Sequence, residues 1–309
     1  MTVTLLGPQR FNVTVPKAVR SLDVDGPVAT VTAGWQEREP DDAELDDLLD
    51  GRSLNLALYR RWLDVSERDP GFGAAQRRSR EILDELHDLY VVRLDHAVEA
   101  VYDVARRGGH PQVHNTALAD AVVAVRALDE RHYTLVAEVH AEFADTVRPH
   151  ERPVVAEHRA AVAAALDRCA ALAIAGGHVG VLLTCLQLFD VAGALGDVPV
   201  VAWSAGAMAV SERVVLFHDR APEGRAYAEV YDAGLALCRG VVPLPHARRR
   251  LRLDDPIRVA LFAQRFAPAR CVVLDDGMRL ELDGATECCP PGTRVLTEEG
   301  HVAELGAAA

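Results

Sequence analysis

The sequence predicts an α/β protein with three layers (α/β/α), in which helices cover both faces of a mostly parallel sheet. Two observations predict this class. Short apolar runs alternate with helical segments over the C-terminal half, as in a parallel sheet with helical crossovers. One such run leads directly into a serine followed by small residues, which indicates a tight strand-to-helix turn. We expect one α/β domain over residues 1–309, with residues 41–167 forming a long helical insertion between core strands.

The composition limits the classes of protein and partner. Half of the residues are hydrophobic and 26% are charged, as in soluble globular proteins. The formal net charge of −13 repels nucleic acids and anionic membranes, so we expect neither as a partner. The basic run Arg248 to Arg250 is a local exception, which we interpret as a solvated face. The six cysteines form no CxxC pair and no signal peptide is visible, so we expect a cytoplasmic protein.

The predicted strands are short apolar runs bounded mainly by Gly, Pro or charged residues. Asp275 to Gly277 lie between two of these runs and predict a hairpin, and Glu298 to Gly300 predict a second, smaller one. In chain order the predicted strands are Val3 to Leu6, Val28 to Thr32, Ala170 to Ala175, Val198 to Trp203, Val214 to Phe217, Gly240 to Leu244, Cys271 to Leu274, Met278 to Leu282, Val295 to Leu296 and His301 to Leu305.

The predicted helices include a long antiparallel pair. Apolar residues recur every three or four positions from Leu83 to Ala105, which places them on one helix face. Residues 108–111 break this helix, and Asn115 or Thr116 caps a second one that reaches Phe143. A helical hairpin is the simplest structure for this stretch. Further helices are expected from Ala205 and over Pro256 to Phe266.

The apolar strand that ends at Ser204 has the pattern of a nucleophile elbow. Small residues follow the serine, as a tight turn requires, and the start of a helix stabilises developing negative charge. Ala202 stands where the elbow of α/β-hydrolases has Gly, and a simple strand-to-helix junction is the alternative interpretation. An earlier strand ends in Gly176-Gly177, whose backbone N–H groups could complete an oxyanion hole with that of Ala205.

Two histidines follow strands downstream of the serine. His246 ends the strand that begins at Gly240, and His218 ends the strand that begins at Val214. A base must come within hydrogen-bond reach of the nucleophile, and the edge of a neighbouring strand can place it there. A structural role is the alternative for either histidine.

In combination, these motifs resemble the aspartyl dipeptidase and cyanophycinase family of serine peptidases. The resemblance rests on Ser204 to Ala207, on the Gly-Gly strand end before them and on the Gly-Val-Val strand that precedes His246. It covers Cys169 to about Gly284, together with the opening strands. It implies the class I glutamine amidotransferase-like fold, a flavodoxin-like arrangement, and a peptidase that cleaves a small peptide or amide.

The resemblance also implies a catalytic triad and shows where this chain departs from the family. Ser204 is then the nucleophile, His246 the base and Asp276 the orienting acid, with Asp275 one place away. The family often has Glu at the acid position. It also follows its paired glycines with Asn or Asp and then Gln, whereas this chain has His178-Val179, which leaves the substrate open.

Further expectations concern substrate, cofactor and partner. Gln36 and Arg38 follow a strand at the same sheet edge and, with His178, are candidate substrate-binding residues, although a charged loop is the alternative for the first two. We expect no metal, because Pro111 interrupts the spacing of the nearby histidines, and no cofactor. The insertion either roofs the site or forms a homodimer surface. The alternative functions are a non-catalytic ligand-binding or assembly protein on the same fold and a glutamine amidotransferase-like amidase, which normally requires Cys at the elbow.

Overall fold

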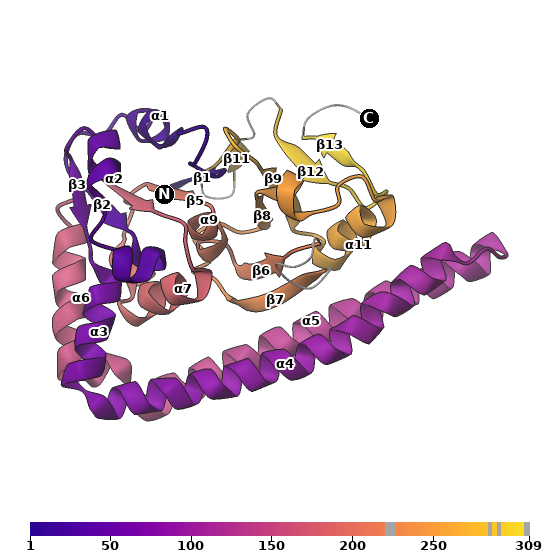
Figure 1. Cartoon of the computed structure of the whole chain (residues 1–309), viewed down its shortest axis with the longest axis horizontal. Coiled ribbons are helices and arrows are strands. Elements are labelled where there is room, and N and C mark those ends of the chain that lie inside the picture. Colours follow the sequence, from indigo (N-terminus) through magenta and orange to yellow (C-terminus); the bar gives the residue numbers. More distant parts are fainter. Residues whose placement is uncertain (220–226, 284–285, 289–291, 306–309) are drawn as a thin grey trace.

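The computed structural model describes residues 1–219, 227–283, 286–288 and 292–305. In this part of the chain the largest sheet has seven strands in the order β11-β10-β1-β5-β4-β2-β3. β1, β5, β4, β2 and β3 run parallel, and β10 and β11 add an antiparallel edge (Figure 1). The strands are β1 (Thr2–Leu6), β2 (Val28–Val31), β3 (Ser53–Asn55), β4 (Ala171–Ile174), β5 (Val200–Trp203), β10 (Arg279–Asp283) and β11 (Thr286–Cys288).

Two smaller sheets complete the β-structure of the described residues. One has the order β13-β12-β9-β8, with β8 and β9 parallel, and the other is the antiparallel ribbon β6-β7. Their strands are β6 (Arg213–Phe217), β7 (Ala228–Ala233), β8 (Val241–Pro245), β9 (Arg270–Leu274), β12 (Arg294–Leu296) and β13 (Val302–Glu304). The small hairpin predicted around Glu298 to Gly300 is confirmed as β12-β13.

Helices cover both faces of the seven-stranded sheet. Leu6 and Ala173 pack with α1 and α2 on one face, whereas Leu5 and Ile174 pack with α3, α6 and α7 on the other. Strands buried on both faces are apolar throughout, which is why the central ones show little alternation. The helices are α1 (Val15–Arg20), α2 (Ala43–Leu48), α3 (Leu58–Arg68), α4 (Pro70–Arg106), α5 (Pro111–Val147), α6 (Pro153–Leu166), α7 (Val179–Leu188), α8 (Val191–Ala194), α9 (Ala205–Ala209), α10 (Ala247–Arg250) and α11 (Pro256–Phe266), with 3-10 turns η1 (Ala33–Arg38) and η2 (Pro149–Glu151). The predicted α/β class with a mostly parallel central sheet is confirmed.

Residues 41–167 are not entirely helical, contrary to expectation. β3 pairs in parallel with β2, so that Leu54 lies opposite Ala29. The Asp46 carboxylate accepts hydrogen bonds from the Ser53 N–H and hydroxyl at 3.0 and 2.7 Å. Three residues are too few to show a period of two, and a distant strand stabilises this one, so the local pattern could not reveal it.

The prediction of a β-hairpin around Asp275 to Gly277 is wrong. The turn itself forms, with the Met278 N–H donating to the Asp275 carbonyl at 3.0 Å. Its two flanking strands, however, enter different sheets, because β9 pairs with β8 and β12 while β10 pairs with β1 and β11. The second long helix also begins earlier than predicted. It starts at Pro111, whose fixed φ suits a first turn, with His110 as its N-cap.

The helical hairpin α4-α5 projects well beyond the body of the molecule (Figure 1). Each helix has 37 residues, which corresponds to a length of about 55 Å. A buried ion pair joins the hairpin to α11: Arg265 contacts Asp129 through Nε to Oδ2 at 2.5 Å and through Nη2 to Oδ1 at 2.7 Å. The Tyr90 hydroxyl donates to the same carboxylate at 2.7 Å. No helix of the described residues is both long and apolar enough to cross a membrane.

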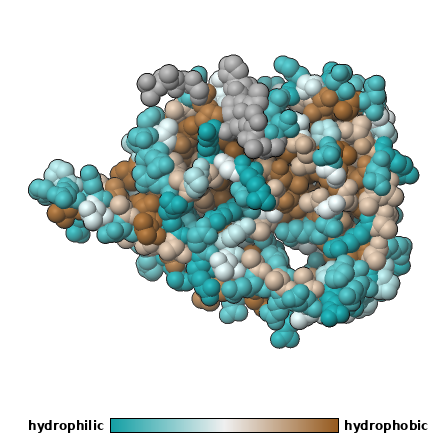
Figure 2. All heavy atoms as spheres, turned by 180° about the vertical axis from the view of Figure 1, so that it is seen from behind, coloured by the Kyte–Doolittle hydropathy of each residue, from teal (hydrophilic) through white to brown (hydrophobic). Residues whose placement is uncertain are grey.

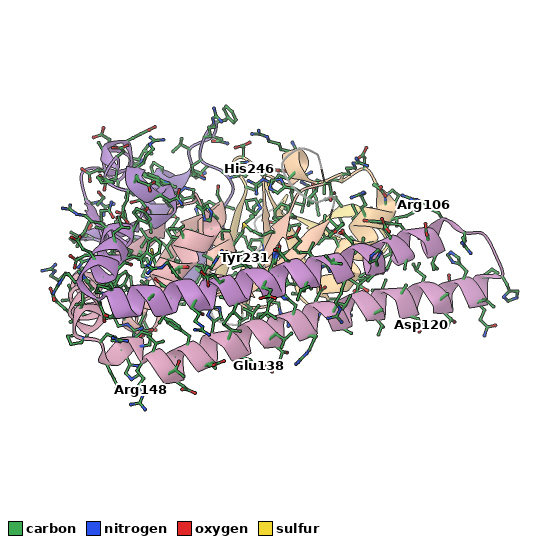
Figure 3. All side chains as sticks on the ribbon, turned by 60° about the horizontal axis from the view of Figure 1, so that its bottom comes forward. Arg106, Asp120, Glu138, Arg148, Tyr231 and His246 are labelled. Carbon is green, nitrogen blue, oxygen red and sulfur yellow. The ribbon has the colours of Figure 1, made fainter. Side chains whose placement is uncertain are left out.

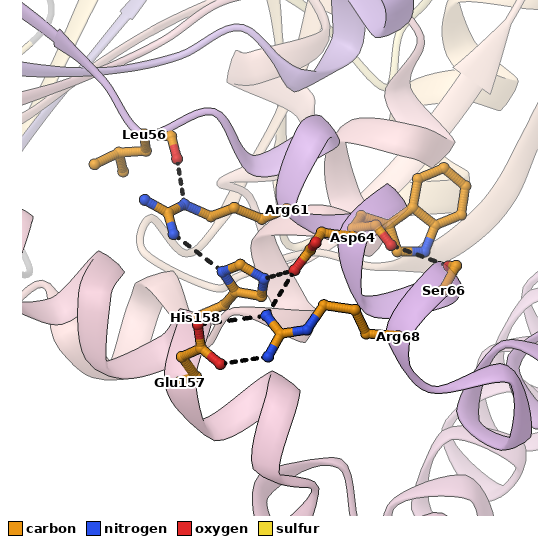
Figure 4. Close-up of polar contacts among 8 residues, drawn as sticks. Leu56, Arg61, Asp64, Ser66, Arg68, Glu157 and His158 are labelled. Carbon is orange, nitrogen blue, oxygen red and sulfur yellow. Dashed lines mark hydrogen bonds and ion pairs between the residues drawn. The ribbon is translucent and has the colours of Figure 1, made fainter.

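A polar cluster between α3 and α6 fixes the base of the hairpin (Figure 4). His158 Nε2 lies 2.7 Å from Asp64, and its Nδ1 lies 3.1 Å from Arg61. Because Arg61 can only donate, the ring accepts at Nδ1 and donates to Asp64. Arg68 bridges Asp64 at 3.0 Å and Glu157 at 2.8 Å. The cluster therefore holds α6 in a defined position against α3.

Candidate active site

A cavity of about 870 Å³ opens at the carboxyl edge of the parallel strands. This edge is where loops after several strands converge, and it is the usual ligand-binding position in open α/β sheets. The cavity is lined by residues that follow β1, β2, β4, β5, β6 and β8, among them Pro8, Gly34, Gly176, Ser204, His218 and His246.

Ser204 lies at the sharp turn between β5 and α9. Its backbone has φ 52° and ψ −121°, a conformation that costs energy for a residue with a side chain. The turn is tight because Gly206 packs against β4: a Cβ there would lie 2.4 Å from the Ile174 carbonyl oxygen. Ser204 is half-buried and lines the cavity. This is the geometry that the sequence predicts for a nucleophile elbow.

The paired glycines after β4 lie directly beside this turn. A Cβ on Gly176 would lie 2.7 Å from the Ser204 Cβ, and one on Gly177 would lie 2.3 Å from the Gly34 carbonyl oxygen. Within the described part of the chain, the N–H groups of Gly176, Gly177 and Ala205 donate no hydrogen bond. The structure therefore brings the three predicted oxyanion-hole residues next to Ser204.

His246 follows β8 and begins α10 in the left-handed conformation, at φ 60°. Its N–H donates to the Leu274 carbonyl at 3.2 Å, which ties the turn to β9. The half-buried ring lines the same cavity as Ser204, and Figure 3 shows His246 on the body, away from the hairpin. Burial lowers the pKa of His246, and the positive charge of Arg250 lowers it further. The ring is therefore neutral at pH 7 and able to accept a proton.

The Ser204 hydroxyl and the His246 ring form no hydrogen bond among the described residues. Catalytic hydrogen bonds are often long or poorly aligned until substrate binds. The fold places both side chains at one cavity, although β5 and β8, which they follow, belong to separate sheets.

The two aspartates after β9 occupy different environments. Asp275 is buried, and its carboxylate accepts from the Arg248 N–H at 3.0 Å and from the Arg294 guanidinium at 3.0 Å. Asp276 is exposed, and its negative charge raises the pKa of His246, opposing the effect of burial. Asp275 therefore binds Arg248 and Arg294, and the charges of both aspartates raise the pKa of His246, that of Asp276 more strongly.

His218, which follows β6, also lines the cavity. The adjacent Asp219 accepts from the Arg252 N–H at 2.9 Å and pairs with Arg258 at 3.3 Å. Asp219, the acid next to His218, therefore binds Arg252 and Arg258. Both histidines therefore line the same cavity as Ser204.

The three predicted substrate-binding residues are placed differently. Arg38 lines the cavity and pairs with the exposed Asp41 at 3.3 Å. Gln36 and His178 are not among the described residues that line it. The His178 ring caps α7, accepting from the Val181 N–H at 3.2 Å. Gln36 has nearly the same backbone angles as Ser204, φ 58° and ψ −125°.

Several cavity residues were missed at the sequence level. The loop after β1 is folded by Gln9, whose side chain accepts from the N–H groups of Thr14 and Val15 at 2.6 and 3.0 Å. That loop places Arg10 on one wall, and Glu44 of α2 lies on another. Gly7-Pro8 at the end of β1 was the available signal, because it marks a strand end at the same edge. The sequence predicts a solvated face for the basic run Arg248 to Arg250, but Arg250 lines the cavity.

The polar side chains of the lining carry hydroxyl, amide, imidazole, carboxylate and guanidinium groups. No cysteine is found among the described lining residues, and Cys185, Cys238 and Cys271 are buried in the core, where burial raises their thiol pKa. Over the described residues, no group of three or more His, Cys, Asp and Glu side chains is arranged to hold a metal ion.

Comparisons with known proteins find a solved structure with a similar fold, but they do not assign the chain to a family. No protein-family model and no curated protein matches the chain. Among solved structures, it is similar to a crystal structure of a peptidase from an acI-B1 Actinobacterium. That match has a TM-score of 0.50 and 12% identity, and it covers 100% of this chain and 95% of the other. At this identity the likeness shows a shared fold over nearly the whole length of both proteins.

Proposed function

We propose that this protein is a serine hydrolase of the peptidase type, which cleaves a small peptide or amide through an acyl-enzyme. Ser204 is the nucleophile, His246 the general base and Asp276 the orienting acid. One observation carries the proposal: a serine in a strained strand-to-helix turn faces a cavity that a neutral histidine also lines. An activated nucleophile needs this pairing of a hydroxyl with a base.

In the proposed reaction His246 removes the Ser204 proton as the hydroxyl attacks the amide carbonyl. The tetrahedral oxyanion binds the backbone N–H groups of Ala205 and of the Gly176-Gly177 turn. The imidazolium then protonates the leaving amine, and a water activated by the neutral ring hydrolyses the ester. Asp276 stabilises the imidazolium by its charge, and Arg38 supplies a positive group toward the substrate.

The finer assignment is to the aspartyl dipeptidase and cyanophycinase family on the class I glutamine amidotransferase-like, flavodoxin-like fold. It is supported by the motifs around Ser204 and His246, by the cavity that both residues line, and by a structural neighbour described as a peptidase. The absence of a thiol from the described lining favours serine over cysteine chemistry.

A fluorophosphonate probe tests the proposal, because it labels serines whose hydroxyl is activated. We expect labelling of the wild-type protein and none of Ser204→Ala. Labelling and turnover of a peptide library should fall about as far in His246→Ala, since a triad acts as a unit.

His218→Ala is the matched control, because it removes a second imidazole from the same cavity. It should keep most of the labelling. If His218→Ala is inert while His246→Ala still reacts, the base is misassigned. If the folded wild-type protein is not labelled, a ligand-binding role on this fold replaces the enzymatic one.

A further inference from the structure

A second cavity, of about 560 Å³, lies between the base of the hairpin and the body. It is lined by residues of α4, α5, α6, α7 and β7, and its volume is within the range of small-molecule sites. From behind, Figure 2 shows the surface perforated toward the end of the molecule opposite the projecting tip. No described residue lines both this cavity and the one at Ser204.

One part of this cavity is apolar. Leu83 of α4, Phe143 of α5 and Leu188 of α7 contribute side chains, with Ala137 and Ala144 leaving room between them. Leu188 is buried in the core, so this wall is firmly packed. Such a surface favours the hydrocarbon part of a ligand, because its burial removes apolar area from water.

Most charged groups around the cavity are already neutralised. His140 Nε2 lies 2.8 Å from the buried carboxylate of Asp232. Arg80 pairs with Asp84 at 3.0 Å and donates to the Tyr231 hydroxyl at 2.5 Å; Figure 3 shows Tyr231 beside the hairpin. These pairs connect the hairpin to β7.

Arg159 of α6, which also lines the cavity, has no ion-pair partner among the described residues. Its Nε donates to the Leu188 carbonyl at 2.7 Å, while its two terminal nitrogens have no hydrogen-bond or ion-pair partner in the part of the chain that the structure describes. Asp190 is the acid that acts on it by charge, but it lies beyond ion-pair distance. Burial lowers the pKa of Arg159, and the negative charge of Asp190 opposes this effect. The guanidinium fork is thus oriented, half-buried and available to an anion.

Arg159 is also held in place from its own helix. The preceding residues of α6, Glu157 and His158, are bound to Arg68 and Asp64 of α3 (Figure 4). A fixed helix and a fixed Nε leave little freedom for the terminal nitrogens, and this preorganisation favours binding.

We propose that this cavity binds a small organic carboxylate with an apolar body, such as a medium-chain fatty acid. The carboxylate pairs with the terminal nitrogens of Arg159, and the hydrocarbon chain lies against Leu83, Phe143 and Leu188.

Calorimetric titration of the full-length protein with octanoate tests the site, with octanol as the uncharged probe of the same length. We expect saturable binding of octanoate, and octanol binding at least tenfold more weakly. Arg159→Gln, which keeps a side-chain donor but removes the charge, should weaken octanoate binding at least tenfold. Ala144→Trp, which fills the cavity from the exposed side of α5, should abolish it.

Arg131→Gln is the matched control, because Arg131 lies on the exposed surface of α5, paired with Glu138 at 3.7 Å. It should bind octanoate like the wild type, and circular dichroism checks that every variant is folded. The proposal is overturned if wild-type protein does not bind octanoate, or if octanol binds equally well. Undiminished binding by Arg159→Gln or by Ala144→Trp would also overturn it.

Discussion

Gly176 lies against Ser204 so closely that no side chain fits between them. A Cβ at this position would lie 2.7 Å from the Ser204 Cβ, closer than real Cβ atoms approach. Gly176→Ala must therefore displace either the nucleophile or the end of β4. Since a displacement of about 1 Å can cost a hundredfold in rate, we expect kcat to fall about a hundredfold. Steady-state kinetics on the best peptide substrate measure this effect.

Gly108→Ala is the control for that substitution. Gly108 lies between the two long helices with nothing within 4 Å of an added Cβ, so activity should stay at the wild-type level. A Gly176→Ala variant with normal kcat would mean that Ser204 does not depend on this contact.

The protonation of His246 sets the pH dependence of the proposed reaction. Its pKa is lowered from 6.5 by burial, by Arg250 and by Arg249, while Asp276 and Asp275 raise it. The base acts in its neutral form, so kcat/KM should fall as the pH drops through a value below 6.5. Arg250→Gln removes a cation and should move this acidic limb to higher pH. Asp276→Asn removes an anion and should move it to lower pH.

Profiles of kcat/KM against pH for the three proteins test these directions. Arg38→Gln is the matched control, because Arg38 lines the same cavity but is not among the charges that act on His246. Its limb should stay in place even where KM rises. Shifts opposite in sign for Arg250→Gln and Asp276→Asn would assign the limb to a different group.

At the scale of secondary-structure elements, Asp275 and Asp276 have separable roles. Asp275 binds the first turn of α10 and Arg294 of β12, so it joins two elements to the end of β9. Asp275→Asn should cost about 1–3 kcal/mol of unfolding free energy, as expected for charged hydrogen bonds. Asp276 is exposed, so Asp276→Asn should change stability by less than about 0.5 kcal/mol while lowering activity. Urea unfolding distinguishes them, and equal stability losses would refute the division.

The attachment of the hairpin to the body depends on Asp129. Asp129→Asn leaves the guanidinium of Arg265 buried without its charged partner, so we expect a loss of about 3–5 kcal/mol in unfolding free energy. The neighbouring Glu130 pairs with Arg213 on the surface, and Glu130→Gln should cost less than about 1 kcal/mol. Chemical denaturation of both variants makes the comparison, and similar losses would show that burial of the pair is unimportant.

At the scale of the whole molecule, the sequence predicted what local patterns can encode. Some features could be predicted from the sequence because each depends on residues close together in the chain. These are the strand before Ser204, the paired glycines after β4 and the long helical pair. Ser204 and His246 both follow predicted strands, and in the structure both line one cavity.

Other features depend on which distant segments pair, and the local pattern did not reveal them. Asp275 to Gly277 have residue types typical of a hairpin turn. The strands on either side of them do not pair with each other, however, because β10 pairs with β1 and β9 pairs with β8. The strand β3 forms because it pairs with the edge of β2, a strand distant in the sequence. Arg10 and Arg250 reach the cavity through loops whose paths depend on the assembled sheet. No spacing within the sequence records such long-range contacts.

The projecting hairpin determines how the molecule scatters X-rays in solution. A compact domain of 309 residues has a radius of gyration of about 19 Å. Two helices of about 55 Å that extend past the body place mass far from the centre, so a monomer should give a larger radius and a pair-distance distribution with a long tail. Small-angle scattering coupled to size exclusion measures both. A symmetric distribution at the compact radius would mean that the hairpin folds back onto the body in solution.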